Sequence, residues 1–111
     1  MVIHARVGKE LVGIVDLHLG KEAVAHVGRL GLTVKKEYRG RGIGRALVEK
    51  MIAEARKNKQ IKIIKLGVFA ENLVAINLYQ SLGFKQFGKL PNGIKHQGKY
   101  SDHDYYYLDV S

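Results

Sequence analysis

Hydrophobic and polar positions alternate along the first third of the chain, which is the pattern of β-strands buried on one face. Val2 to Val7 forms a short apolar run, and Leu11 to Leu19 follows after a turn that contains a glycine. A longer strand is predicted from Ala23 to Val34. The fold is therefore expected to open with three strands.

The spacing of the apolar residues then changes to that of an amphipathic helix. Ile43, Leu47 and Met51 recur at intervals of four residues with charged residues between them, and Asn58 can end the run. The segment from Ile61 to Phe69 is rich in β-branched residues, which predicts a buried strand.

A second helix and two more strands are predicted in the last third of the chain. Asn72 can cap the start of a helix, and Gly83 can end it in a left-handed conformation. Phe84 to Leu90 and His103 to Val110 are predicted strands, joined by a turn-rich loop around Pro91-Asn92-Gly93. The order β-β-β-α-β-α-β-β predicts an α+β fold with a mixed, mostly antiparallel sheet and helices packed on it.

Length and composition limit the class of protein. The chain has 111 residues, of which 46% are hydrophobic and 26% charged, so we expect a single domain over residues 1–111. The lack of cysteine excludes disulfides, a thiolate nucleophile and a thiolate metal site. No apolar run approaches the roughly 20 residues that cross a bilayer, and no signal-peptide pattern opens the chain. A soluble, cytoplasmic protein that does not bind membranes is expected.

The chain is strongly basic, with 19 Lys and Arg against 10 Asp and Glu and a formal charge of +9. This charge fits nucleic acid, an anionic membrane surface or a polyanionic small molecule, and charge alone does not choose among them. The basic residues are spread along the chain, without a recognition helix or a stacking-aromatic motif. Nucleic acid is therefore not the expected partner.

The segment with the clearest chemistry lies between the third predicted strand and the first predicted helix. It reads Tyr38-Arg39-Gly40-Arg41-Gly42-Ile43-Gly44-Arg45. A strand that leads through glycines into a helix directs backbone N–H groups and the positive end of the helix dipole to one place, which suits a phosphate group. Glycine lets oxygen atoms approach the amides and permits positive φ, and the arginines would add charge-assisted hydrogen bonds. The spacing predicts a diphosphate site, although it matches neither common nucleotide fingerprint, and a plain glycine-rich turn is the alternative.

This segment and a second motif resemble the GNAT superfamily of acetyl-CoA-dependent N-acetyltransferases. The acetyl-CoA loop of that family reads Arg/Gln-x-x-Gly-x-Gly/Ala, and Arg39, Gly42 and Gly44 fill it. The second motif, Asn-Leu-Val-Ala-Ile-Asn-Leu-Tyr, runs from Asn72 to Tyr79. The resemblance covers about Leu11 to Val110 and implies the acyl-CoA N-acyltransferase fold of the family.

The resemblance implies acetyl-CoA as co-substrate, no metal, and a set of binding residues. The backbone of Leu32 to Val34 would pair with the pantetheine arm, and the glycine-rich segment would hold the pyrophosphate. Tyr79 would protonate the departing CoA thiolate or hydrogen-bond its sulfur, whereas without the motif it is typical of a core tyrosine. Asn72 would contact the cofactor, cap its helix, or do both. The implied cofactor-binding residues are Leu32, Thr33, Val34, Arg39, Gly40, Arg41, Gly42, Ile43, Gly44, Arg45, Asn72 and Tyr79.

The implied reaction is direct attack of a neutral primary amine on the thioester, with the oxyanion stabilised by a backbone N–H near Val34. An alkyl amine is protonated at pH 7, so another group must accept its proton. The positions where many relatives carry a base correspond here to Gly28 and Gly67, which have no side chain. His26 is the nearest titratable substitute and the candidate catalytic base, and an ordinary strand-end histidine with weak or water-mediated base assistance is the alternative. Weaker candidates are Asp16, His18 and Glu71.

Family members usually begin with a strand and two helices on the acceptor side, so the resemblance is to an N-terminally abbreviated member. The acceptor pocket is expected to be open, completed by a partner subunit, or built by the late loop, and an uncovered sheet edge predicts a homodimer. His103 lies between two aspartates, but alternating strand faces prevent these three residues from converging on one ion. Tyr105-Tyr106-Tyr107 would cover the sheet edge or line an acceptor site.

The sequence therefore predicts an N-acetyltransferase that moves an acetyl group from acetyl-CoA to an amine of a small molecule or a protein. The alternative is a CoA-binding module that has lost productive catalysis, because Gly28 and Gly67 stand at the expected base positions. The identity of the acceptor does not follow from the sequence.

Overall fold

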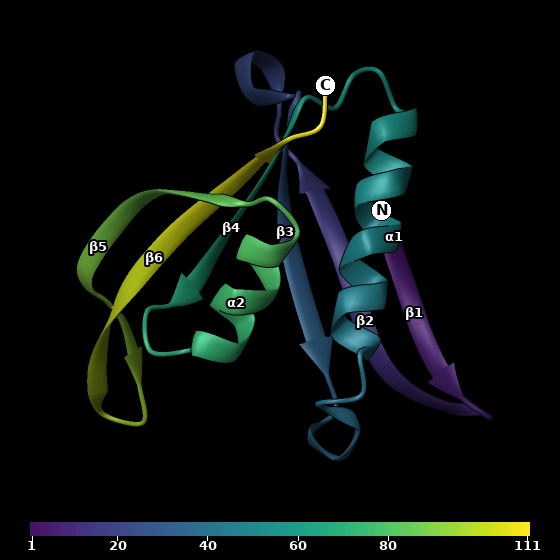
Figure 1. Ribbon diagram of the computed structural model, residues 1–111. Helices are drawn as coiled ribbons and strands as arrows, with labels where there is room; N and C mark the ends of the chain where they lie inside the picture. The colour runs from purple at the N-terminus through teal and green to yellow at the C-terminus, as the bar shows by residue number, and fades with distance from the viewer. The chain divides into compact units, whose positions relative to one another are not determined.

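A computed structural model describes residues 1–111 as a six-stranded sheet with two α-helices and two short 3₁₀ turns (Figure 1). The strand order is β1-β2-β3-β4-β6-β5. This mixed sheet confirms the predicted fold class and the predicted order of elements. Neither α-helix is both long and apolar enough to cross a membrane. The elements are β1 (Val2–Val7), β2 (Glu10–Leu19), β3 (Val27–Val34), α1 (Ile43–Lys57), β4 (Ile63–Phe69), α2 (Leu73–Ser81), β5 (Lys85–His96) and β6 (Lys99–Asp109), with 3₁₀ turns η1 (Glu22–Val24) and η2 (Lys36–Tyr38).

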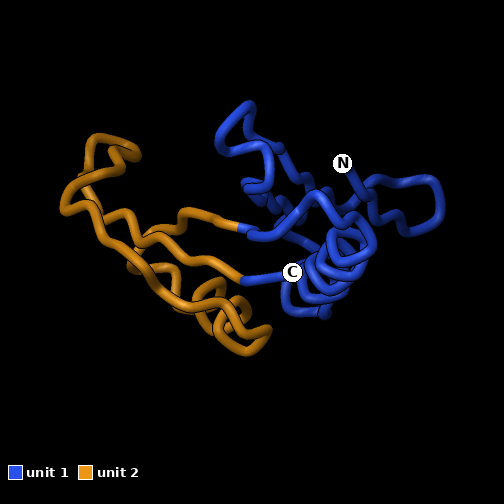
Figure 2. Tube along the Cα trace, turned by 90° about the horizontal axis from the view of Figure 1, so that it is seen from above, with its two compact units in different colours: residues 1–64, 109–111 blue, residues 65–108 orange.

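The chain forms two compact units (Figure 2). Unit 1 comprises residues 1–64 and 109–111, and unit 2 comprises residues 65–108.

In unit 1, helix α1 packs on the antiparallel strands β1, β2 and β3. The helix and the sheet approach each other closely at Gly13 of β2, where a Cβ would lie 3.0 Å from Cδ1 of Leu47. Apolar residues on one side of the helix and on β2 and β3 are buried, as the helical spacing predicts. The core residues of this layer include Val15, Leu17, Leu30, Leu47, Val48, Met51, Ile52 and Ala55. This packing fixes the start of α1 relative to β2 and β3.

The third strand is shorter than predicted. It starts at Val27, and the predicted residues 23–26 instead form most of η1 and the turn that follows it. The chain folds back tightly here, because the Gly20 amide donates to the Val27 carbonyl at 3.0 Å and a Cβ on Gly20 would collide with the Val24 carbonyl. His26 therefore lies in a turn and not on a strand face.

In unit 2, β5 and β6 form one long hairpin with a tight turn at Gln97-Gly98, where both residues have positive φ. The loop predicted around Pro91–Gly93 is wrong: these residues form a bulge within β5, across which the register shifts. Proline has no N–H to give to the ladder, and the Asn92 amide donates instead to the Asp102 carboxylate at 3.0 Å. The strand therefore continues past the proline.

Helix α2 begins and ends where the sequence predicts. The Asn72 side chain accepts a hydrogen bond from the Ala75 amide at 3.1 Å, and Gly83 follows the helix with φ of 97°. Leu66 of β4 and Tyr106 of β6 are buried, while their strand neighbours point to the opposite, less covered side. We call that side the open face of unit 2; its residues are Lys65, Gly67 and Phe69 on β4, Phe87 on β5, and His103, Tyr105 and Tyr107 on β6.

Candidate functional site

The glycine-rich segment of unit 1 has the backbone that the sequence predicts. Gly40 and Gly42 have φ of 76° and 80°, in the left-handed region that favours glycine. A Cβ on either residue would meet no atom within 4 Å. Glycine is therefore required here by the backbone conformation, and the space beside the segment is open to a ligand.

The amides at the start of α1 suit an anion. The Ala46 amide makes a helical bond to the Gly42 carbonyl at 3.0 Å, and helix geometry leaves the amides of Ile43 and Gly44 before it without a carbonyl of their own helix. No side chain caps the helix at Gly42, and its first turn holds no acidic residue. The positive end of the helix dipole is therefore not neutralised by the chain itself.

The arginines of this segment each have a different neighbour. Arg39 donates through Nε to the Val34 carbonyl at 3.1 Å, and the Arg41 guanidinium lies 5.0 Å from the centre of the Tyr38 ring. Arg45 pairs with Glu49 one helical turn away at 3.2 Å. A guanidinium has five N–H donors, so the bond to Val34 leaves Arg39 able to bind an anion as well.

A hydrogen-bonded contact from β2 supports the start of this segment. Glu10 accepts from Lys35 at 3.0 Å and from the Tyr38 hydroxyl at 2.9 Å. These hydrogen bonds, that from Lys35 first, lower the pKa of the Glu10 carboxyl from its ordinary value of 4.5. Since Tyr38 also contacts Arg41, the chain of contacts runs from β2 to the glycine-rich segment. Sequence reasoning missed Glu10, because its contacts depend on the register of β2 against β3.

The end of β3 directs two backbone amides away from β2. The Lys35 amide donates to the Val12 carbonyl at 2.8 Å, and Val34 lies opposite Gly13 in the ladder. In an antiparallel pair, successive residues direct their N–H and C=O groups alternately toward the partner strand and away from it. The N–H and C=O groups of Val34 and Leu32 therefore point to the other edge of β3. Those are the groups that the resemblance assigns to the pantetheine arm and the oxyanion, whereas the backbone of Thr33 is used in the ladder with β2.

In unit 2, Tyr79 is buried and its ring packs edge-on against Phe84, with ring centres 5.6 Å apart. Burial raises the pKa of the Tyr79 phenol above its ordinary value of 10. The Tyr79 hydroxyl has no hydrogen-bond partner in the chain. Every fully buried side-chain N or O atom of the protein has such a partner, so the Tyr79 oxygen is accessible to solvent. The ring is therefore a core element whose polar end stays open.

The candidate positions for a catalytic base differ in their exposure and in the side chains around them. His26 is exposed, and its carbonyl accepts from the amides of Lys62 and Ile63. A Cβ on Gly28 would lie 2.7 Å from the Leu17 side chain, so Leu17 fills the space there. A Cβ on Gly67 would collide with the His103 imidazole. The weaker candidates have polar partners, Asp16 with His18 at 3.3 Å and Glu71 with Ser101 at 3.1 Å.

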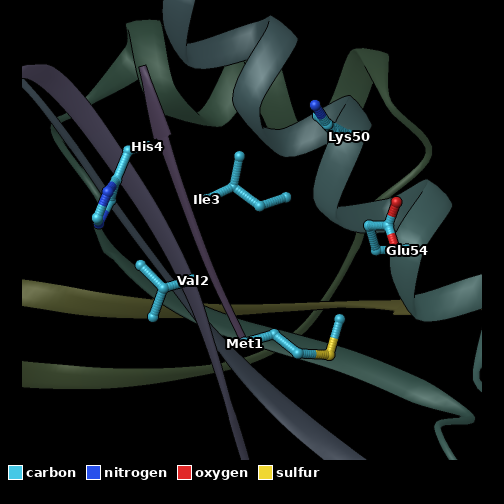
Figure 3. Close-up of a pocket in the computed structure, with 6 residues that line it drawn as sticks. All are labelled: Met1, Val2, Ile3, His4, Lys50 and Glu54. Atoms are coloured by element: carbon cyan, nitrogen blue, oxygen red, sulfur yellow. The ribbon is translucent and has the colours of Figure 1, made fainter. Parts of the chain in front are cut away.

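A hollow of about 460 Å³ lies elsewhere in unit 1, beside β1 and α1 (Figure 3). None of its residues belongs to the predicted site. No group of three or more His, Asp or Glu side chains is placed to hold a metal ion. The hollow is lined by Met1, Val2, Ile3, His4, Lys50 and Glu54.

Residues 1–84 match the model of the acetyltransferase (GNAT) family. N-acetylaspartate synthetase of Xenopus tropicalis is 38% identical over 85 residues, which are 77% of this chain and 31% of that protein. The ribosomal protein bS18-alanine N-acetyltransferase of Escherichia coli is 42% identical over 55 residues, which are 50% of this chain and 36% of that protein. The chain thus spans about a third of the length of these two relatives.

Solved structures share the fold over almost the whole chain. An acetyltransferase of the GNAT family from Streptococcus pneumoniae superposes with a TM-score of 0.93 at 27% identity, over 97% of this chain and 66% of that chain. The ribosomal-protein-alanine N-acetyltransferase of Brucella melitensis gives 0.90 at 28% identity, over 97% and 67%. The fold is also that of yncA from Salmonella typhimurium, solved with its cofactor acetyl-CoA, with a TM-score of 0.91 at 21% identity, over 99% and 64%.

Proposed function

Because the chain belongs to the acetyltransferase (GNAT) family, we propose that residues 1–111 act as one N-acetyltransferase domain that moves the acetyl group of acetyl-CoA to a primary amine. The family uses acetyl-CoA, and one neighbour of the same fold was solved with it. The observation that carries the proposal is the start of α1, where two left-handed glycines lead into an uncapped first turn without acidic residues. The acceptor is a small molecule or a protein amino group.

The cofactor would be held by main-chain groups. The amides of the segment from Gly40 to Arg45 would bind the pyrophosphate, with Arg39 adding charge. The outward backbone of Leu32 and Val34 would pair with the amide groups of the pantetheine arm, as an added strand does. Asn72 is assigned to the cofactor by the resemblance alone, since its side-chain oxygen already accepts from the Ala75 amide.

The reaction would be a direct attack of the neutral amine on the thioester carbonyl. The Val34 amide would stabilise the oxyanion. A thiolate leaving group with a pKa near about 8.5 gains from a proton donor as its charge develops. Tyr79 would be that donor, because a phenol is protonated at neutral pH and burial raises the pKa of Tyr79 further. The sequence predicts His26 as the base, but His26 lies in an exposed turn before β3 and not on a strand face.

Two experiments test the proposal. Isothermal titration calorimetry with CoA and acetyl-CoA should show binding at one site. A thiol-release assay with acetyl-CoA and a panel of amines should show release that depends on the amine. Binding without such release would favour the second candidate, a CoA-binding module without productive catalysis, which the glycines at positions 28 and 67 support.

The acceptor class is only partly constrained. The net charge of +9 disfavours polycationic acceptors, because like charges repel at encounter. The homodimer and the cytoplasmic location stay predictions of the sequence. Light scattering at micromolar concentration tests the homodimer, and a monomeric mass would contradict it.

A further inference from the structure

Acetyl transfer to an amine needs a proton acceptor, and the histidines differ sharply in their environments. The chain has five, and four of them, His4, His18, His26 and His96, are exposed. His103 is the half-buried one, on strand β6 of unit 2. An imidazole is the side chain that most readily exchanges a proton near neutral pH.

The imidazole of His103 lies in the space that a side chain on Gly67 would take. Strands β4 and β6 are linked by a hydrogen bond from the Ala70 amide to the Asp102 carbonyl at 3.0 Å. A Cβ built on Gly67 would collide with Nε2 of His103 and lie 2.9 Å from its Cε1 and 3.1 Å from its Cδ2. Only a glycine on β4 leaves room for this ring.

The ring is held in one orientation. The Tyr105 hydroxyl lies 3.0 Å from Nδ1 of His103, and the two ring centres are 4.4 Å apart. On the other side, a Cβ on Gly93 would lie 2.9 Å from Cβ of His103, so the β5 bulge packs against the base of the side chain. Nε2 can accept a proton in the tautomer whose Nδ1–H donates to the Tyr105 oxygen, because the lone pair of the neutral ring then lies on Nε2.

Nε2 of His103 is left available. This nitrogen has no hydrogen-bond partner in the chain. Every fully buried side-chain N or O atom of the protein has such a partner, so Nε2 of His103 is accessible to solvent. Here one nitrogen is anchored and the other lies beside a glycine on the open face.

We propose that Nε2 of His103 is the general base that accepts a proton from the acceptor amine. The His103 ring lies where a side chain on residue 67 would otherwise lie. The proposal rests on the proposed function. The ammonium group of the acceptor gives up two protons: one passes to Nε2 and then to water. The nitrogen lone pair forms the new C–N bond, the C–S bond breaks with its electron pair on sulfur, and the second proton ends on the CoA thiol. Tyr105 is a positioning residue that holds Nδ1.

Other groups along this face set the background of any pH dependence. They comprise three lysines, a second histidine, an acidic side chain beyond the end of β4, and two phenols. They are Lys65 on β4, Lys85 and His96 on β5, Lys99, Tyr105 and Tyr107 on β6, and Glu71 after β4. The acceptor amine also titrates, so the informative quantity is the difference between the pH profiles of the wild type and of a His103 variant.

The experiment measures amine-dependent thiol release and acetyl-CoA affinity for the wild type and for His103→Ala and His103→Gln. Loss of a general base lowers kcat/KM by about 100-fold or more, whereas acetyl-CoA affinity by calorimetry should stay within twofold. The wild-type profile should contain a rise with pH that is missing in His103→Gln. Added imidazole should restore part of the rate of His103→Ala, which a purely structural role would not allow.

Two further variants make the test specific. His96→Ala, which removes an exposed histidine that packs against Phe69, should keep the wild-type rate. Gly67→Ala should lower kcat/KM in the wild type, because its Cβ displaces the ring, and should cause no further loss in His103→Ala. Circular dichroism and thermal unfolding show whether each variant is folded, and His103→Gln keeps a side chain of similar size if the alanine variant does not fold.

The possible results separate the two proposals. Amine-dependent release by the wild type together with His103 variants at the wild-type rate overturns the role of His103 and leaves the proposed function standing. The same holds if His26→Ala loses activity while the His103 variants do not. A wild type that releases no thiol with any amine overturns both. Loss of rate in both His103 variants, with unchanged cofactor affinity and rescue by imidazole, supports His103 as the base.

Discussion

The Tyr38 hydroxyl donates to Oε1 of Glu10 at 2.9 Å, although the two residues are 28 positions apart in the chain. The same Tyr38 ring lies beneath the guanidinium of Arg41, 5.0 Å from the ring centre. Turn η2 is thereby tied to the start of β2 at the first residue of the glycine-rich segment. The shape of that segment depends on a carboxylate that no motif in the sequence marks.

Replacing Glu10 by Gln should destabilise the protein at neutral pH, because the charge that Lys35 and Tyr38 hydrogen-bond is lost. The pKa of Glu10 is lowered in the folded state, so its contribution is present above the ordinary value of 4.5 and is lost as the pH falls through the folded value. Urea unfolding of both proteins from pH 3 to pH 7 should show curves that converge at the acid end. Glu22→Gln, at an exposed acid without a partner, should follow the wild type throughout.

Replacing Gly42 by Ala should weaken acetyl-CoA binding and lower stability by about 1–2 kcal/mol, the cost of a non-glycine residue in the left-handed region. Gly98→Ala is a matched control, because Gly98 has φ of 77° and, like Gly42, no atom within 4 Å of a built Cβ. Both variants should lose similar stability by denaturant unfolding. Only Gly42→Ala should lose affinity in calorimetry, and equal affinity in the two variants would speak against the pyrophosphate site.

Tyr79→Phe should reduce kcat by about 100-fold or more, the effect of removing a general acid, while leaving the unfolding midpoint close to that of the wild type. The hydroxyl makes no hydrogen bond within the chain, so its removal costs the fold little. Tyr106→Phe is the control, since Tyr106 is also buried in unit 2 and lies on the side of β6 opposite the open face. A steady-state thiol-release assay compares them, and equal rates would place Tyr79 among ordinary core residues.

Asn72→Ala should destabilise the protein by about 1 kcal/mol, because α2 loses the side chain that accepts from the Ala75 amide. Asn72→Asp keeps an oxygen acceptor at the cap and should recover most of that stability. Denaturant unfolding measures both. If the aspartate variant is stable but binds acetyl-CoA less well than the wild type, Asn72 has a cofactor contact in addition to its cap.

The elements that local sequence patterns determine were predicted closely. Helix α1 has a buried face set by the spacing of Leu47 and Met51 and ends at Asn58, as expected. The glycines at positions 40 and 42 were expected to require positive φ, and they do. Such features depend on neighbours within a few residues, which a single sequence contains.

Features that depend on contacts between distant segments were missed. Strand β3 starts at Val27, later than predicted, because the chain folds tightly around Gly20. The pairing of Glu10 with Tyr38 depends on strand register. The contact between His103 and Gly67 joins two strands separated by a helix and a hairpin strand. The sequence showed that Gly67 has no side chain, but not that a ring from β6 occupies its place.

The bulge at Pro91–Gly93 also has a consequence for solubility. Strand β5 is the outermost strand on its side of the sheet, where an unbroken ladder of free N–H and C=O groups would invite other chains to add themselves. The proline offers no donor and the bulge interrupts the regular ladder, while Lys89 and Lys95 place charge along the strand. This border of the molecule is thereby protected against uncontrolled self-association and the growth of fibrous aggregates.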